Sequence, residues 1–406
     1  MKSELDDLMK ARDLDGLVVV GNAEHNPPMT YLTGGGHVNH AVLVKKRGAE
    51  AVLFCSQMER EEAAKSGLKV SPMVFAPMRE LLKDSAAANM FAEAGLTEGR
   101  VAVYGQADVS AVFLALSNLQ KSMPALVFIG EGSDDNVFMR AMETKDEHEV
   151  ARIRQMGQIT TEVVGLVADY LTGREVRPDE VLLKEDQTPL TIGDVKSRIS
   201  LWLAERGAET PHGFIFAIGR DAGVPHSVGN PDDLLRLGRT IVFDIYPAEA
   251  GGGYFYDFTR TWSLGYATPE AQALYDEVKA VYDKVCDNLD LNAPFKEYQR
   301  LACEEFEKNG HPTPLGTSAP LEGYVHSLGH GLGLNIHERP WSGLTSDDGG
   351  RLQPGVVMTI EPGLYYPEKG MGVRIEDSYA VRPDGKMELL AQYPYDFVLK
   401  MKKWSG

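Results

Sequence analysis

Three histidines lie close together in the glycine-rich segment YVHSLGHGLGLNIHERP, residues 324–340. They are His326, His330 and His337, three of the ten histidines in the chain. A single histidine in an apolar segment is most often a hydrogen-bonded core residue. The cluster therefore indicates a catalytic or metal-binding site only if other polar side chains lie close to it. The glycines at 329, 331 and 333 disfavour a helix, because each costs about 1 kcal/mol there. We therefore expect this segment to be extended.

Four acidic side chains stand in apolar, strand-like segments elsewhere in the chain. Asp244 and Asp257 flank a glycine-rich turn in TIVFDIYPAEAGGGYFYDFTRTW, so a hairpin with an even loop would place them opposite each other. Glu361 ends the apolar segment VVMTIEPG. Period-two alternation in GVRIEDSYAV places Glu376 on one face with Arg374. We expect a cation to receive these acids, because burying an unpaired carboxylate is costly.

The acids have two possible explanations. Each one alone could form an ion pair with a buried arginine or lie on an exposed strand edge. Together with a histidine, four carboxylates without a thiolate form a hard ligand set that suits Mn²⁺, Co²⁺ or Zn²⁺. Four carboxylates are too many for one divalent ion, so the set predicts two cations and a hydrolytic centre.

Bulk properties exclude several classes of protein. The chain has 406 residues, 43% of them hydrophobic, so it can bury a large core and two domains are expected. A formal charge of −18 disfavours nucleic acid and anionic membranes as partners. Cys55, Cys286 and Cys303 are too few and too distant for a disulfide framework, and the first residues lack the pattern of a signal peptide. We therefore expect a cytoplasmic protein that does not bind nucleic acid or cross a membrane.

The pattern of secondary structure predicts two domains. In the first third of the chain, β-rich segments alternate with helical ones, which predicts an α/β domain at residues 1–140. The capping-box pattern Thr144-Lys-Asp-Glu147 and the apolar residues that follow predict a long helix that opens a second domain, residues 141–406. The strands predicted in the first domain are residues 16–20, 41–45, 51–55, 101–105 and 126–130.

Two more helices are predicted in the second domain. One begins at Thr268 with Pro269 in its first turn, and the other spans residues 296–308 before Asn309-Gly310. The polar segment 173–192 is expected to be a loop. The remainder from residue 213 onward is expected to be mostly strand and turn, so the candidate ligands would be carried by strands.

These motifs resemble those of the metallopeptidases of the pita-bread fold, and among them the Xaa-Pro peptidases, proline dipeptidase and aminopeptidase P. The resemblance spans the whole chain, includes MTYLTG at residues 29–34, and is most specific in the second domain. It implies a creatinase-like α/β N-terminal domain and an α+β pita-bread catalytic domain. It also implies two divalent metal ions, Mn²⁺ or Co²⁺ first and Zn²⁺ as an alternative, with these ligands: Asp244, Asp257, His330, Glu361 and Glu376.

The resemblance also implies roles for residues around the metals. His226, in VPHSVGNPDD, and His337 are expected to hydrogen-bond the scissile carbonyl. Glu361 is expected to carry a proton from the attacking water to the leaving nitrogen, and His326 and Arg374 are expected to line the substrate site. Taken without the resemblance, His226 could instead be a surface loop histidine and His337 a hydrogen-bonded core residue.

The activity implied by the resemblance is hydrolysis of Xaa-Pro peptide bonds by a hydroxide bound to two metals, in a homodimer that acts on small peptides with proline in second position. Dipeptidase and aminopeptidase both stay open, because neither Arg339 nor Arg351 can be assigned to a free proline carboxylate. The alternatives are a methionine-aminopeptidase-like enzyme and a non-catalytic binding protein on the same fold. The interval between Asp244 and Asp257 is about two residues longer than the family pattern, which preserves side-chain parity if the insertion lies in the turn.

Overall fold

The computed structural model describes residues 4–75, 77–81, 84–345 and 349–404. The chain forms two compact units, one of Met1–Thr144 with Gly251–Gly253 and one of Lys145–Ala250 with Tyr254–Gly406. The division falls after Thr144, whereas the sequence pattern places the boundary at residue 140. In the described residues, no helix is both long enough and apolar enough to cross a membrane.

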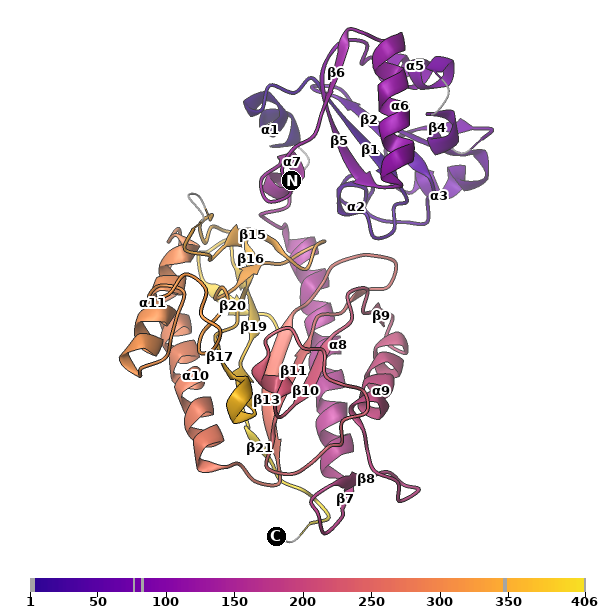
Figure 1. The fold of residues 1–406 in the computed structure, drawn as a ribbon. Helices are drawn as coiled ribbons and strands as arrows, with labels where there is room; N and C mark the ends of the chain where they lie inside the picture. Colours follow the sequence, from indigo (N-terminus) through magenta and orange to yellow (C-terminus); the bar gives the residue numbers. More distant parts are fainter. Residues whose placement is uncertain (1–3, 76, 82–83, 346–348, 405–406) are drawn as a thin grey trace. The chain divides into compact units, whose positions relative to one another are not determined.

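The N-terminal unit is a six-stranded sheet with helices around it (Figure 1). The strand order is β4-β3-β2-β1-β5-β6, and β1 pairs antiparallel with β2 and parallel with β5. The apolar core lies between this sheet and helices α5 and α6. The strands are β1 (Gly16–Gly21), β2 (Ala41–Lys46), β3 (Val52–Ser56), β4 (Lys69–Met73), β5 (Gly99–Gln106) and β6 (Leu126–Ile129). The helices are α1 (Leu5–Ala11), α2 (Pro27–Thr33), α3 (Arg60–Ala64), α4 (Pro77–Glu80), α5 (Asp84–Glu93), α6 (Val109–Ser122) and α7 (Val137–Ala141).

The five strands predicted for this unit are all present, and one strand was missed. The missed strand, β4, lies at the edge of the sheet, contains Pro72 and is largely solvent-accessible, so it has neither the apolar run nor the ladder donors of a central strand. Gly34 ends α2 with φ of 82°, a left-handed conformation that suits glycine.

The second unit opens with the long helix α8 (Glu147–Thr172). Its capping box is formed by Asp146 and Glu149, not by the predicted Thr144 and Glu147. Both pairs have the required spacing, and the sequence pattern does not choose between them. The Glu149 side chain is buried and accepts a hydrogen bond from the Tyr254 hydroxyl, so tertiary contacts favour the later start.

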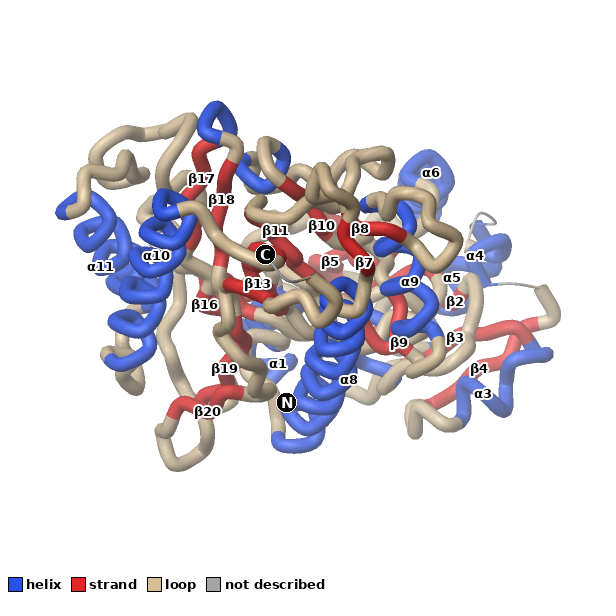
Figure 2. Tube along the Cα trace, turned by 90° about the horizontal axis from the view of Figure 1, so that it is seen from below, coloured by secondary structure: helices blue, strands red, loops and turns tan. Residues whose placement is uncertain are grey.

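Helices flank the strands of the second unit on two sides (Figures 1 and 2): α10 and α11 cover one flank, and α8 and α9 cover the other. The two predicted helices are confirmed, and the Thr268 hydroxyl caps α10 as expected. The segment 173–192, expected to be a loop, contains the short paired strands β7 and β8. The helices are α9 (Ile192–Ala204), α10 (Pro269–Asp287) and α11 (Phe295–Lys308).

Two sheets of the second unit carry the candidate ligands. The first has the order β10-β11-β13-β21, and the second has the order β15-β14-β16-β19-β20. Buried side chains of α10 and α11 pack against β16 and β18 in one apolar core. The strands are β7 (Glu175–Val176), β8 (Leu182–Leu183), β9 (Ala208–Glu209), β10 (Ile215–Ile218), β11 (Thr240–Ile245), β12 (Ala248–Glu249), β13 (Phe258–Leu264), β14 (His330–Gly331), β15 (Glu338–Trp341), β16 (Val357–Ile360), β17 (Gly363–Tyr366), β18 (Met371–Arg374), β19 (Asp377–Val381), β20 (Met387–Leu389) and β21 (Val398–Leu399).

Candidate metal centre

The predicted ligands and the predicted substrate-site residues line a single cleft of about 640 Å³ in the second unit. The histidine-rich segment is extended as expected, with His330 on the short strand β14. The predicted residues around this cleft are Asp244, Asp257, His330, Glu361 and Glu376, together with His226, His326, His337 and Arg374.

The hairpin that carries the two aspartates has a different register from the one predicted. Asp244 on β11 pairs with Thr259 on β13, and Asp257 lies one residue before β13, so the two acids are not directly opposite. The pairing is regular throughout both strands, which places the extra length between them in the connecting segment. A shift of two residues preserves side-chain parity, and both acids therefore still reach the same cleft.

Arg374 and Glu376 do not lie on one continuous strand, contrary to the alternation argument. Strand β18 ends at Arg374, and β19 begins at Asp377 in another sheet. Glu376 lies between them and forms a bridge with Thr259 of β13. The chain thus crosses from one sheet to the next at Glu376, and this crossing brings its carboxylate beside the aspartate hairpin.

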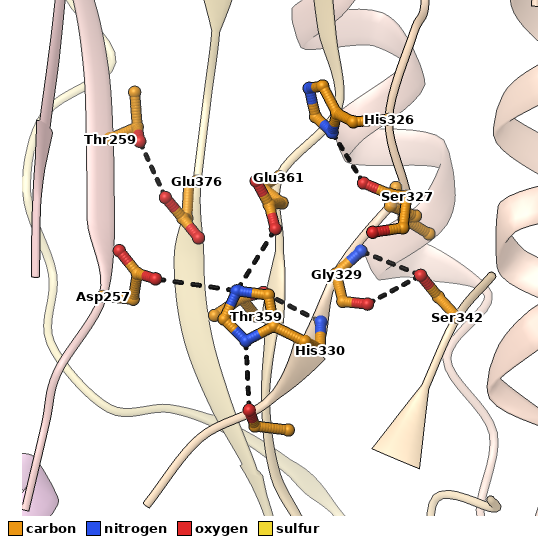
Figure 3. A network of polar contacts seen from close by, with 12 residues as sticks. Asp257, Thr259, His326, Ser327, Gly329, His330, Ser342, Thr359, Glu361 and Glu376 are labelled. Carbon is orange, nitrogen blue, oxygen red and sulfur yellow. Dashed lines mark hydrogen bonds and ion pairs between the residues drawn. The ribbon is translucent and has the colours of Figure 1, made fainter. Parts of the chain in front are cut away.

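Three of the predicted ligands converge closely enough to hold one cation. Asp257, His330 and Glu376 each offer a ligand atom, and these atoms lie within 4.8 Å of one another. His330 Nε2 is 3.6 Å from Asp257 Oδ2 and 3.4 Å from Glu361 Oε1, and both carboxylates turn toward the imidazole ring (Figure 3). The Thr259 hydroxyl donates to Glu376 Oε2 at 2.7 Å and orients that carboxylate.

Two buried carboxylate oxygens in this cleft, Asp244 Oδ1 and Glu376 Oε1, have no hydrogen-bond donor among the described residues. Glu376 is 1% exposed and Asp244 is 9% exposed, so both carboxylates are shielded from bulk solvent. A buried anionic oxygen without a donor is costly, and a divalent cation would remove that cost. The four carboxylates and one imidazole therefore fit the hard cations Mn²⁺, Co²⁺ and Zn²⁺.

The pKa shifts of the carboxylates reflect this crowding of negative charge. Burial and the charge of Asp244 hold the pKa of Asp257 well above its ordinary value. Burial and the charge of Asp257 do the same to the pKa of Glu376. Burial also raises the pKa of Asp244, although the adjacent Arg374 guanidinium opposes that shift. Without cations, the cluster is more stable when it holds protons.

His330 and Glu361 stabilise each other's charged forms, so the pKa of Glu361 is lowered and the pKa of His330 is raised. Burial would raise the pKa of Glu361, but the hydrogen bond and positive charge of His330 outweigh it and lower the pKa of Glu361 to about 2. Burial would lower the pKa of His330, but Glu361 and Asp257 outweigh it and raise the pKa of His330 to about 9. In the metal-free protein the two side chains therefore form an ion pair at neutral pH.

Tyr365, on β17, joins two predicted residues and was not found from the sequence. Its hydroxyl accepts from Arg374 Nη1 at 2.6 Å and lies 2.8 Å from His326 Nε2. Arg374 also forms an ion pair with Asp244 through Nη2. The buried guanidinium is thus committed to protein partners, and its direct effect is to position Asp244 and Tyr365.

His337 and His226 are the exposed histidines of the predicted set. The His337 ring packs edge-on against the His330 ring, with centroids 4.3 Å apart. Partial desolvation by the cleft walls and the nearby His330 charge lower the pKa of His337 to about 4, so its imidazole is neutral at neutral pH. A neutral imidazole with one N–H can donate a hydrogen bond to a substrate carbonyl without adding a full positive charge.

Seven further residues line the cleft and were not predicted from the sequence, among them Ser327, which follows His326 directly. Tyr246 could have been found, because it lies two residues after Asp244 and alternation places it on the same face. His212 stacks on Phe255 with ring centroids 5.7 Å apart, and no local sequence pattern predicts this contact. The missed residues are His212, Ile215, Val228, Tyr246, Ser327, Ile336 and Trp341.

Comparison with known proteins agrees with this architecture. Residues 151–383 match the model of metallopeptidase family M24, and residues 2–130 match the creatinase/prolidase N-terminal domain. An uncharacterized peptidase of Staphylococcus aureus (strain MW2) is 27% identical over 368 residues, which cover 89% of this chain and 92% of that protein.

Two solved structures share the fold. A Xaa-Pro dipeptidase from Bacillus anthracis is similar with a TM-score of 0.76 and 20% identity, covering 98% of this chain and 99% of that one. The prolidase from Pyrococcus horikoshii OT3 gives a TM-score of 0.74 and 22% identity, covering 97% of this chain and 99% of that one. The predicted fold class, a creatinase-like N-terminal domain before a pita-bread domain, is confirmed, and the chain belongs to metallopeptidase family M24.

Proposed function

We propose that this protein hydrolyses the peptide bond that precedes proline in short peptides, with two divalent cations held in the cleft. The observation that supports this proposal is the convergence of four acids and one histidine, with two buried carboxylate oxygens that lack donors. Mn²⁺ or Co²⁺, a homodimer and a cytoplasmic location belong to the same proposal and rest on the family resemblance. Elemental analysis identifies the bound metal, and the molecular mass in solution shows whether the protein is a dimer.

The proposed ligands are Asp244, Asp257, His330, Glu361 and Glu376. When bound, divalent cations at such a site lower the pKa of water toward neutrality and polarise the scissile carbonyl. Thr259 and Arg374 hold two of the carboxylates in place, through Glu376 Oε2 and Asp244 Oδ2. The protein therefore supplies a site whose charge and orientation are prepared before substrate arrives.

Glu361 is the proposed proton carrier. Its side chain is 16% exposed, against 12% for Asp244 and 6% for Asp257, so it is the most accessible of these three carboxylates. The carboxylate is ionised at neutral pH and would accept a proton from the attacking water. The proton would then pass to the proline nitrogen as the bond breaks, because that tertiary nitrogen needs a proton to leave.

His226 and His337 are proposed to hydrogen-bond the scissile carbonyl oxygen. We expect His337→Ala to lower kcat about 100-fold, a typical loss for one donor to a developing oxyanion. Metal content should not change, because His337 is not a proposed ligand. Steady-state kinetics with elemental analysis of the same sample checks this. A loss of metal equal to the loss of activity would instead place His337 among the ligands.

The choice between dipeptidase and aminopeptidase depends on how the substrate's C-terminus is held. Among the described residues, Arg374 is the arginine or lysine that lines the cleft, and it is already bound to Asp244 and Tyr365. Arg351 donates to the Asn292 carbonyl instead, and Arg339 does not line the cleft. The side chains of this cleft therefore favour neither activity.

A peptide panel tests the proposal. We expect cleavage of Ala-Pro or of Ala-Pro-Ala, and at least about tenfold less cleavage of Ala-Ala, because an Xaa-Pro bond has no N–H and its ring fixes φ. Mass spectrometry of the products identifies the bond that is cut. Equal rates on Ala-Ala and Ala-Pro would remove the proline preference, and a protein that binds no metal and cuts none of the peptides would be a binding protein on the same fold.

A further inference from the structure

A buried ion pair connects the start of helix α8 to the turn that carries His337. Lys145 Nζ lies 2.8 Å from Glu338 Oε2, and the side chains are 2% and 0% exposed. The two residues are 193 positions apart in the sequence. A fully buried ion pair gives little net stability, because desolvation of both charges offsets their attraction. The main consequence of this pair is therefore geometric, because it fixes where the Glu338 carboxylate lies.

The other oxygen of Glu338 shapes the turn between β14 and β15. Glu338 Oε1 accepts from the Asn335 backbone N–H at 2.9 Å and from its side-chain amide at 3.2 Å. Gly333 N donates to the Asn335 carbonyl at 3.1 Å, which closes the turn. The carboxylate thus lies inside the turn of residues 333–337, and Lys145 holds it there.

His337 is the last residue of that turn and directly precedes Glu338. Its ring contacts the His330 ring, and His330 begins the other strand of the same hairpin. The Glu338 carboxylate holds the backbone of this turn in place. The conformation of that backbone sets the direction in which the His337 imidazole points into the cleft. Movement of the carboxylate toward water would open the turn and move this imidazole.

Gly333 shows how closely the pair is enclosed. A Cβ at this position would lie 2.4 Å from Glu338 Oε2 and 2.7 Å from Lys145 Cε. Only glycine allows the turn to approach the pair, so a methyl group would displace one of its members. The Lys145 backbone is fixed independently, because its N–H donates to the Gly355 carbonyl at 2.7 Å.

We infer that Lys145 and Glu338 are positioning residues, which set the orientation of His337 toward the substrate carbonyl. This inference rests on the proposed function. Neither residue lines the cleft or is a proposed metal ligand, and the pair acts through the turn 333–337. Loss of one charge leaves the other buried and unpaired, whereas loss of both charges leaves a neutral pair that can remain in place.

The experiment compares Lys145→Met with the double variant Lys145→Met/Glu338→Gln. We expect the single variant to lower kcat about 100-fold with KM within about threefold, because a displacement of about 1 Å costs that much in a prepared site. The double variant should recover most of the loss. Arg154→Met is the control, because it removes an ion pair between the same helix and Glu388, away from the turn.

Two readouts separate this inference from the proposed function. If the wild-type protein cuts no peptide, the proposed function fails, and crystal structures of the variants still test the pair through the position of the His337 ring. We expect this ring to move in Lys145→Met and to return in the double variant. If Lys145→Met does not fold, Glu338→Gln and Gly333→Ala take its place.

Three results would overturn the inference. The first is a folded Lys145→Met protein with wild-type kcat and an unmoved His337 ring. The second is a loss of kcat that matches a loss of bound metal. The third is a double variant as impaired as the single one, which would show that the charges act separately.

Discussion

Glu376→Gln is expected to reduce peptidase activity at least about a thousandfold, since loss of metal-based charge stabilisation removes several kcal/mol of transition-state binding. Glu376 is 1% exposed, and its Oε1 atom has no donor among the described residues. An amide in its place carries no charge and offers one weak oxygen ligand. Steady-state kinetics and elemental analysis should show the loss of activity together with the loss of metal.

The same substitution should have the opposite effect on the metal-free fold. Burial and neighbouring acids raise the pKa of Glu376, so its contribution to stability is present below its unfolded pKa near 4.5 and is lost as pH rises through the folded pKa. Glutamine cannot ionise and avoids that loss. Above neutral pH we expect metal-free Glu376→Gln to be at least as stable as the metal-free parent, measured by urea unfolding.

Added metal distinguishes the variant from its controls. At 100 times Kd, a bound cation raises the free energy of unfolding by about 2.7 kcal/mol in the parent protein, and the variant should show little of this gain. Glu368→Gln is a matched control, because that glutamate is exposed and pairs with Arg220 outside the cleft. A Glu376→Gln protein that keeps both metal and turnover would exclude Glu376 as a ligand.

Removal of divalent cations is expected to bring activity to background, and added Mn²⁺ or Co²⁺ should restore it. In the metal-free protein, protons occupy the site at neutral pH, because the pKa of His330 is raised to about 9 and the pKa values of Asp257 and Glu376 are also raised. Cations must displace these protons. We therefore expect metal binding to release at least about one proton per chain at pH 7 and to tighten as pH rises.

Calorimetric titration in two buffers with different enthalpies of ionisation measures this release. The free energy of unfolding of the metal-free protein should also depend on pH through His330. The stabilising contribution of His330 is fully present below its unfolded pKa near 6.5 and is lost as pH rises through about 9, so the metal-free protein should lose stability between pH 7 and 10. Saturation with metal should reduce that loss. Full turnover in a sample shown to contain no metal would contradict both the site and the proposed mechanism.

Local sequence patterns were sufficient to identify much of the fold. The central strands of the N-terminal sheet are apolar runs buried between helices, and their composition alone predicts them. Helix α10 has a threonine cap and a first-turn proline, which are local signals. Edge strand β4 has neither signal, so the sequence analysis missed it. The cap of α8 was misplaced by two residues because a buried contact of Glu149 decides between two equal patterns.

In the candidate site too, some features follow from local sequence patterns and others depend on long-range contacts. Residue types in short motifs were sufficient to nominate the residues that the structure brings to one cleft, because side-chain chemistry and alternation along a strand are local properties. The register of Asp244 with Thr259 and the change of sheet at Glu376 are long-range contacts. So are the approach of His212 to the cleft, the hydrogen bond of Tyr365 with Arg374 and the ion pair of Lys145 with Glu338. Such contacts depend on which segments pack together, so only the tertiary structure could decide them.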